Sequence, residues 1–275
     1  MELIDGRLIA KKILNDVAAK VSELDFQPVF CDVLVGDDPA SSQYVGMKAK
    51  TAQRVGIKFR NANYPGTIST EDLIAEIKKI SEEPNLKGLI VQLPLPKQID
   101  REAVLNAIKP EVDVDCTGQV NTNLFYEGKP YVIFPTAGAV MESLDSTGVN
   151  LKEKRFVVLG RGILVGKPVK FLLEQRGYKV DLIHSQTENA DELLKQADVI
   201  ISAVGKPKLI TGDKIKPGSI IIDAGTSESE GGISGDVDFE SVKAVAGYLS
   251  PVPGGVGPIT VAKLLENVLI TSKQK

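Results

Sequence analysis

The stretch from Phe156 to Leu173, FVVLGRGILVGKPVKFLL, joins an apolar, β-rich run to a helix-like pattern through three glycines. A glycine-rich turn between a strand and a helix lets the backbone approach a pyrophosphate, and the helix N-terminus supplies free N–H groups. The spacing, Gly160-x-Gly162-x-x-x-Gly166, differs from the commoner G-x-G-x-x-G. The stretch predicts either a dinucleotide-binding turn or only a tight turn, and its position at the start of a βαβ set favours the first.

Apolar runs alternate with helical patterns in the first half of the chain. Helical spacing from Leu8 to Val21 precedes three strands, and we expect one helix capped by Ser41 or Ser42 and another opened by Ser69 and Asp72. The strands are expected at 28–36, 57–64 and 88–96, the first and third buried on both faces. This β-α-β-α-β order predicts parallel strands with right-handed crossovers.

The alternation restarts at Arg155 after a less regular stretch from 109 to 135 and a helix from Ala137. Four strands are expected, RFVVLG, YKVDLIH, DVIISAV and SIIIDAG, followed by a fifth, AVAGYLS, and a final helix, GPITVAKLLENVLITS. The fold class is therefore α/β with two domains, the second built on a Rossmann-like parallel sheet, and the boundary lies near residue 139.

The end of the second strand of this set bears on the cofactor. NAD sites place an acidic residue there to hold the ribose 2′-OH, but this strand ends in His184, Ser185 and Thr187, and Asp181 lies inside it. Arg161, in the glycine turn, could pair with a 2′-phosphate, so the residues favour NADP over NAD. The alternatives are a solvated surface charge for Arg161 and a helix cap for Ser185.

Polar residues stand out in the first half. Tyr44 and Lys48 are four apart and share a helix face, Gln92 interrupts a buried strand, and Asp113 and Asp115 point the same way if extended. The carboxyl ends of parallel strands collect such residues where open α/β sheets bind ligands. The alternatives are a surface pair for Tyr44 and Lys48, a hydrogen-bonded edge residue for Gln92 and a turn-forming residue for Asp115.

Composition excludes several classes. The chain has 275 residues, a net charge of −3, two cysteines and one histidine. This balance argues against a nucleic-acid surface, and no zinc-ligand spacing or metal site is expected. No signal peptide or membrane-length apolar run is present, so we expect a cytoplasmic protein without membrane partners.

Eight segments in order resemble the methylenetetrahydrofolate dehydrogenase/cyclohydrolase family: GDDPASSQYVGMK, VQLPLP, DVD, GRGILVGKP, ADVIISAVGKP, KPGSIIIDAG, GDVDF and PVPGGVGPITVA. The resemblance implies NADP-dependent oxidation of methylenetetrahydrofolate to methenyltetrahydrofolate, then hydrolysis to formyltetrahydrofolate. It also implies a homodimer, with a catalytic folate-binding domain at 1–138 plus 255–275 and a Rossmann-like NADP-binding domain at 139–254.

The resemblance also assigns roles to residues. Lys48 would be the acid/base group, Gln92 would orient it, Tyr44 would stack near the aminobenzoyl ring, and Asp115 would hold the pterin. Substrate contacts are further expected from Leu93, Pro94, Pro253, Gly254, Gly255, Gly257 and Pro258. The expected cofactor-binding residues are Gly160, Arg161, Gly162, Val165, Gly166, Ser185, Gly205 and Thr226.

The chain departs from the family pattern at several positions. Gly162 stands where the family usually has Ser, residues 116–119 replace the usual GFHP, and FPTA represents the usual PCTP, with Thr136 matching and Ala137 departing. None of these removes Lys48, Gln92 or Asp115. Two alternatives are an NAD(P)-dependent oxidoreductase acting on another small substrate and a non-catalytic nucleotide-binding module.

Overall fold

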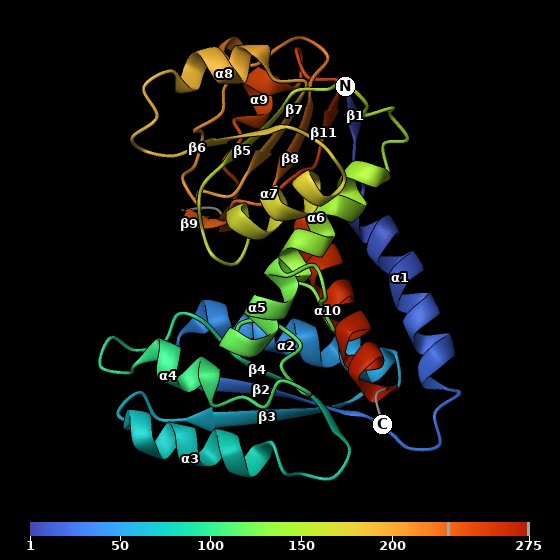
Figure 1. Cartoon of the computed structure of the whole chain (residues 1–275), viewed down its shortest axis with the longest axis vertical. Helices are drawn as coiled ribbons and strands as arrows, with labels where there is room; N and C mark the ends of the chain where they lie inside the picture. Colours follow the sequence, from blue (N-terminus) through green and yellow to red (C-terminus); the bar gives the residue numbers. More distant parts are fainter. Residues whose placement is uncertain (230–231, 274–275) are drawn as a thin grey trace. The chain divides into compact units, whose positions relative to one another are not determined.

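The computed structural model describes residues 1–229 and 232–273 and divides the chain into two compact units (Figure 1). The six-stranded unit contains Met1–Lys11 and Thr136–Lys263, and the three-stranded unit contains Lys12–Pro135 and Leu264–Lys275. The first domain expected from the sequence included residues 1–11 and 255–263, whereas the structure groups these with the six-stranded sheet. Of the helices in the described residues, none is long and apolar enough to span a membrane.

The three-stranded unit is built on parallel strands in the order β3-β2-β4. The strands are β2 (Val29–Val35), β3 (Lys58–Tyr64) and β4 (Leu86–Val91). Helix α2 (Pro39–Arg54) joins β2 to β3, and α3 (Thr70–Ile80) crosses back from β3 to β4. Because the two crossovers run in opposite directions, right-handedness places these helices on opposite faces of the sheet (Figure 1).

The two faces of β2 are buried differently. Cys31, Val33 and Val35 lie in an apolar core with residues of α3 and of α4 (Arg101–Asn106). The intervening residues, Phe30, Asp32 and Leu34, point to the other face because side chains alternate along a strand, and all three are buried. That face therefore encloses one carboxylate among apolar side chains.

The helix caps follow the expectation in one case only. Ser69 caps α3, since its Oγ accepts the N–H of Asp72 at 3.0 Å, which confirms the prediction. The prediction for α2 was wrong, because Asp38 is the cap and its carboxylate accepts the N–H of Ser41 at 2.7 Å. Asp38 precedes Pro39, which suits the first helical turn since proline lacks the N–H that this turn leaves unpaired.

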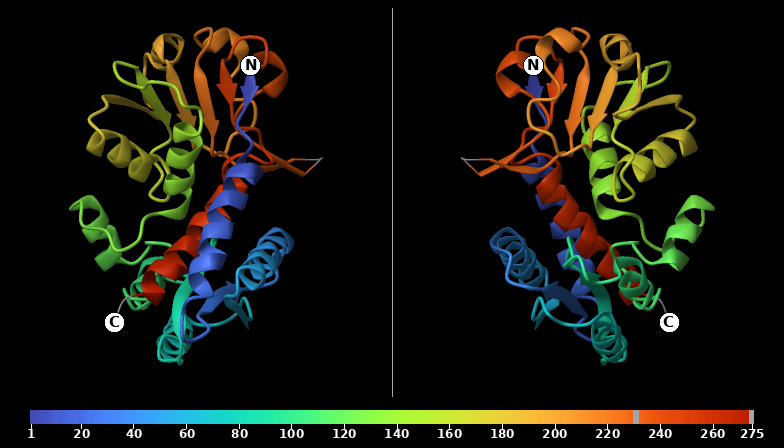
Figure 2. Two further views of the ribbon diagram at one scale, coloured as in Figure 1. Left: turned by 90° about the vertical axis from the view of Figure 1, so that its right-hand side faces the viewer. Right: turned by 90° about the vertical axis from the view of Figure 1, so that its left-hand side faces the viewer.

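The six-stranded sheet has the order β1-β11-β8-β7-β5-β6, with every neighbouring pair parallel (Figure 2). The four expected strands are β5 (Phe156–Leu159), β6 (Val180–Ile183), β7 (Val199–Ser202) and β8 (Ile220–Asp223), and the expected fifth is β11 (Tyr248–Leu249). The N-terminus adds β1 (Glu2–Leu3), which pairs with β11 and was not predicted.

Helices and short segments complete the described chain. The helices α1 (Gly6–Val21), α6 (Pro135–Asp145) and α10 (Val256–Ser272) match their expected positions. The remaining elements are α5 (Gln119–Tyr126), α7 (Gly166–Gln175), α8 (Ala190–Gln196), a 3₁₀ turn (Gly212–Lys214), α9 (Phe239–Val242) and the antiparallel pair β9 (Ser227–Ser229) and β10 (Gly232–Ser234). Helix α5 lies in the stretch that was expected to be irregular.

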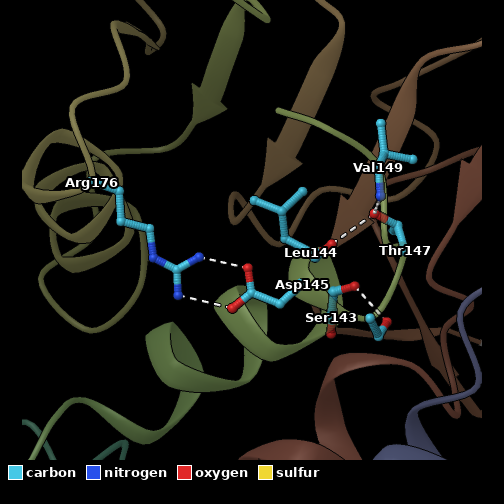
Figure 3. Close-up of polar contacts among 7 residues, drawn as sticks. Ser143, Leu144, Asp145, Thr147, Val149 and Arg176 are labelled. Atoms are coloured by element: carbon cyan, nitrogen blue, oxygen red, sulfur yellow. Dashed lines mark hydrogen bonds and ion pairs between the residues drawn. The ribbon is translucent and has the colours of Figure 1, made fainter. Parts of the chain in front are cut away.

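The end of α6 is tied to the end of α7 (Figure 3). Both guanidinium nitrogens of Arg176 donate to the Asp145 carboxylate, at 2.6 and 2.9 Å. The hydroxyl of Thr147 donates to the carbonyl of Leu144 and accepts the N–H of Val149, which closes the turn after α6. Bidentate pairing is directional, so these contacts fix the far end of α7, the helix that follows the glycine turn.

Candidate functional site

The carboxyl end of the three-stranded sheet gathers several predicted residues. Strand β4 ends at Val91, so Gln92 follows the strand rather than interrupting it as predicted, and its N–H still donates to the carbonyl of Val33 at 2.8 Å. Asp113 forms a parallel bridge with Leu89 of β4, so the segment that leads to Asp115 runs alongside this strand.

Lys48 is the centre of this cluster. Its side chain lies on α2 and is 2% exposed. Its Nζ donates to Gln92 Oε1 at 2.7 Å, lies 2.5 Å from Asp32 Oδ2, and lies 5.1 Å from the centroid of the Tyr44 ring. The predicted Tyr44, Lys48 and Gln92 are therefore brought together around one ammonium group.

Asp32 was not predicted as part of the site. It lies inside β2, and its side chain is fully buried against Lys48. The available signal was a single acidic residue in the apolar run VFCDVLV, because a buried carboxylate must have a partner. The sequence does not show which cation meets it, since the partner lies on a different element.

The charges of this cluster shift the pKa values of Asp115 and Tyr44. Burial and the negative charges of Asp113 and Asp32 raise the pKa of Asp115 to about 6, against the opposing effect of Lys48. Burial and the carboxylates of Asp115 and Asp32 raise the pKa of Tyr44 to about 12. Near neutral pH, Asp115 is thus ionised and can accept hydrogen bonds, and a small fall in pH protonates it. Tyr44 keeps its hydroxyl proton.

Asp113 has a different task from its neighbour. Its carboxylate accepts the N–H groups of Thr117 at 3.2 Å and Gly118 at 2.9 Å and lies within 3.4 Å of Asn121 Nδ2. These bonds shape the turn that leads into α5. Asp113 is therefore a structural carboxylate.

The other expected substrate contacts lie in two places. Leu93 and Pro94 directly follow Gln92, whose Nε2 donates to the carbonyl of Leu93 at 3.2 Å. The residues Pro253, Gly254, Gly255, Gly257 and Pro258 belong to the six-stranded unit, the last two within the first turn of α10. A Cβ on Gly255 would lie 2.6 Å from the carbonyl oxygen of Pro251, and Gly254 has a φ of +109°, so backbone contacts and conformation account for part of this loop's glycine content. Its expected role with substrate stays a prediction.

The glycine turn lies between β5 and α7. Gly160 has a φ of +100°, and a Cβ there would lie 2.4 Å from the carbonyl oxygen of Ala203. A Cβ on Gly166 would lie 1.9 Å from the carbonyl oxygen of Gly160, whereas a Cβ on Gly162 would meet nothing within 4 Å. Val165 is the N-cap residue of α7. Two glycines are thus required by backbone contacts, and the turn leaves open space at Gly162.

The turn also lies where the strand order reverses. Strand β5 pairs with β6 on one side and with β7 on the other, and open α/β sheets bind ligands at this switch point. The loop after β7 is held by the Asp236 carboxylate, which accepts the Ser202 hydroxyl at 2.6 Å and the N–H groups of Val204 and Lys206 at 2.8 and 2.7 Å. Asp236 was not predicted.

The polar groups around the turn fit a phosphorylated dinucleotide. Arg161 and Ser185 are exposed, and Gly205, in the loop fixed by Asp236, has a φ of +76°. Thr226 is exposed after β8. After β6 the chain makes a turn over residues 184–187, in which the N–H of His184 donates to Thr187 Oγ1 at 3.0 Å. This turn lies within the described residues and contains no acidic side chain.

Two family models match the chain. Residues 4–115 match the catalytic domain, and residues 135–275 match the NAD(P)-binding domain, of tetrahydrofolate dehydrogenase/cyclohydrolase. A relative from Methanospirillum hungatei, bifunctional protein FolD, is 42% identical over 265 residues, which are 96% of this chain and 95% of the relative.

Solved structures agree with these matches. The bifunctional FolD enzyme of Campylobacter jejuni is 35% identical, covers 99% of both chains and superposes with a TM-score of 0.95. The FolD of Trypanosoma brucei, solved with NADP cofactor and inhibitor, is 38% identical, covers 98% of this chain and 97% of that one, and has a TM-score of 0.93. The chain belongs to the tetrahydrofolate dehydrogenase/cyclohydrolase family.

Proposed function

We propose that this protein oxidises methylenetetrahydrofolate to methenyltetrahydrofolate with NADP and then hydrolyses the product to formyltetrahydrofolate, two steps of one-carbon metabolism. The observation that carries the proposal is the buried Lys48 ammonium, which contacts Gln92, Asp32 and the Tyr44 ring. Family membership supports the same two activities.

NADP fits the six-stranded unit. The backbone of the Gly160–Gly166 turn would hold the pyrophosphate, because side chains at both ends of the turn are excluded by contacts below 2.5 Å. Arg161 and Ser185 would hold the 2′-phosphate, and Gly205 and Thr226 would contact the rest of the cofactor. When bound, NADP supplies the acceptor for the hydride that leaves the methylene carbon.

The residues of the three-stranded unit would bind the folate and move protons. Tyr44 would stack on the aminobenzoyl ring, with Leu93 and Pro94 beside it, and Asp115 would accept hydrogen bonds from the pterin. Gln92 fixes the position of the Lys48 Nζ. Lys48 would take a proton from the water that attacks the methenyl carbon and deliver one to the departing nitrogen.

A spectrophotometric assay tests the proposal. Purified protein is mixed with methylenetetrahydrofolate and either NADP or NAD, and the methenyl product, the reduced cofactor and the later loss of methenyl absorbance are followed. We expect reduction with NADP to exceed that with NAD, followed by hydrolysis. If neither cofactor is reduced at substantial enzyme concentration, the proposal is wrong.

The two alternatives explain less of the molecule. An oxidoreductase for another substrate and a non-catalytic nucleotide-binding module would both use the glycine turn. Neither gives a reason for burying the Lys48 ammonium between Gln92 and Asp32, which costs solvation free energy.

We also propose that the protein is a cytoplasmic homodimer that binds neither nucleic acid nor membranes. The support is the family resemblance, together with a net charge of −3 that disfavours a phosphate backbone. Light scattering coupled to gel filtration would give the mass in solution, and a monomer at micromolar concentration would contradict the dimer.

A further inference from the structure

Asp32 is a buried carboxylate with a single partner. Its side chain is fully buried, and the Lys48 Nζ lies 2.5 Å from Oδ2. Among the described residues, neither carboxylate oxygen has any hydrogen-bond donor other than this ammonium group. The Lys48 ammonium is therefore the only described cation that compensates this charge.

Other buried carboxylates of the protein are held differently. Asp113 accepts two backbone N–H groups, and Asp236 accepts two backbone N–H groups and a hydroxyl. Backbone amides do not titrate, so these contacts serve to organise the chain around the carboxylate. Asp32 organises no loop, and its one donor can be deprotonated.

Stability does not explain why Asp32 is present. A buried ion pair usually contributes no more than an apolar pair of similar volume, because desolvation of both charges offsets their attraction. The neighbours of Asp32 on the same face of β2, Phe30 and Leu34, are apolar and buried. An apolar residue at position 32 would suit this face, so the carboxylate points to a role in the chemistry of Lys48.

We propose that Asp32 is a positioning residue of the hydrolysis step, which holds the Lys48 Nζ beside Gln92 and takes up its proton to leave a free amine. The inference rests on the proposed hydrolysis of methenyltetrahydrofolate. Burial raises the pKa of the Asp32 carboxyl and Lys48 lowers it, which is consistent with a carboxylate that can accept a proton across a short contact.

The protons balance over the whole step. A proton first moves from Lys48 Nζ to Asp32 Oδ2. The water oxygen then bonds to the methenyl carbon while one water proton passes to the Nζ. The Nζ gives a proton to the departing nitrogen, which keeps the electron pair of the broken C–N bond. The second water proton returns to the Nζ as the carbonyl forms, and the proton on Asp32 is the one that the net reaction releases.

This transfer has a consequence for pH dependence. The pair keeps the same net charge whether the proton is on Lys48 or on Asp32, so the fraction of free amine does not change with pH while the pair stays neutral overall. The other titratable groups around the pair, whose pKa values the negative charge of Asp32 raises, are Tyr44 on α2, Asp115, and Cys31 on the opposite face of β2. Because Asp32→Asn removes this charge and lowers the pKa of Asp115, the ratio of variant to wild-type rates isolates Asp32 only above about pH 7, where Asp115 is ionised in both proteins.

The test is the rate of methenyltetrahydrofolate hydrolysis by Asp32→Asn across pH. Without the carboxylate, Lys48 must lose its proton to solvent. The ratio of variant to wild-type kcat should therefore be about 10- to 100-fold below one near pH 7 and rise by about tenfold per pH unit until the amine is free. A ratio that does not change with pH would overturn the proposal, whatever its value.

Three controls separate the possible failures. Asp32→Glu keeps the carboxylate and should restore a ratio that is flat with pH, which a purely structural role would not require. Cys31→Ala weakens packing on the opposite face of the same strand and should lower Tm slightly while the pH profile stays that of the wild type. If wild-type protein fails to hydrolyse the substrate, the proposed function is at fault; if it hydrolyses and Asp32→Asn shows the wild-type profile, only the role of Asp32 is wrong.

Discussion

The two units prepare their sites in opposite ways. The three-stranded unit uses side chains, with Asp32 Oδ2 and Gln92 Oε1 both held within 2.7 Å of the Lys48 Nζ. The six-stranded unit uses backbone, and its glycine turn is defined by the absence of Cβ atoms at Gly160 and Gly166. One site depends on atoms that are present, and the other depends on atoms that are missing.

This difference follows from what proton transfer and pyrophosphate binding each require. Proton transfer needs a titratable group at a fixed position in a poorly hydrated environment, and buried charge supplies it at a cost in solvation. A pyrophosphate needs several N–H donors at once, which a helix N-terminus and a tight turn provide without side chains. The first site should therefore fail when atoms are removed, and the second when atoms are added.

The largest effect is expected from removing the ammonium group. Lys48→Met should slow methenyl hydrolysis by about 10²- to 10⁴-fold, the range for loss of a general acid–base group. NADP binding, measured by fluorescence titration, should be unchanged because the glycine turn belongs to the other unit. Lys50→Met, which changes an exposed lysine on the same helix, is the matched control and should keep full activity. Hydrolysis retained in Lys48→Met would remove this lysine from the chemistry.

Adding one carbon to the turn should damage the second site. In Gly166→Ala the new Cβ would meet the carbonyl oxygen of Gly160 at 1.9 Å, so the turn must shift at a cost of about 1–3 kcal/mol. We expect the KM for NADP to rise by about 10- to 100-fold while hydrolysis of supplied methenyltetrahydrofolate continues. Gly162→Ala adds the same carbon in open space and should leave Tm near the wild-type value. An equal loss of Tm in both variants would show that contact distance does not decide the outcome.

Local patterns predicted much of both sites. Tyr44 and Lys48 fall on one helix face at a spacing of four, and the glycine turn follows its strand directly, so both can be recognised within a short window of sequence. Asp32 could not be assigned, because its partner Lys48 lies on another element and the contact depends on how α2 packs on β2. Asp236 was missed for the same reason, since the loop that it holds lies earlier in the chain.

The fold shows the same division between local and distant information. Every strand with a clear apolar run was predicted, but β1 pairs with β11 from the other end of the chain, and two residues carry too little pattern to reveal such pairing. The cap of α2 was misassigned because serines and an aspartate compete within a few positions. The helical hydrogen-bond register decides between them, and sequence alone does not fix that register.

Arg161 tests whether the backbone site also uses a side chain for selectivity. Arg161→Ala should weaken NADP binding by about 1–3 kcal/mol, the value of a charge-assisted hydrogen bond, and leave NAD binding nearly unchanged. Isothermal titration with each cofactor measures the difference. Equal losses for both cofactors would mean that Arg161 does not contact the 2′-phosphate and that the selectivity lies elsewhere in the turn.

The smallest effect concerns pH and the two carboxyl groups whose pKa burial raises to about 6, Asp115 in the three-stranded unit and Asp223 in the six-stranded unit. Because both values lie above the ordinary value of about 3.9, the stability that these groups contribute is complete at low pH and is lost as pH rises through 6.

The effect of pH on folate binding by Asp115 has the opposite sign, since protonation removes the acceptor that the pterin needs. The KM for methylenetetrahydrofolate should rise severalfold as pH falls below 6, and this rise should disappear in Asp115→Asn. Asp223 lies in the six-stranded unit, so a KM for NADP that follows the same pH curve would show that the effect is not specific to Asp115 and would break the contrast between the two sites.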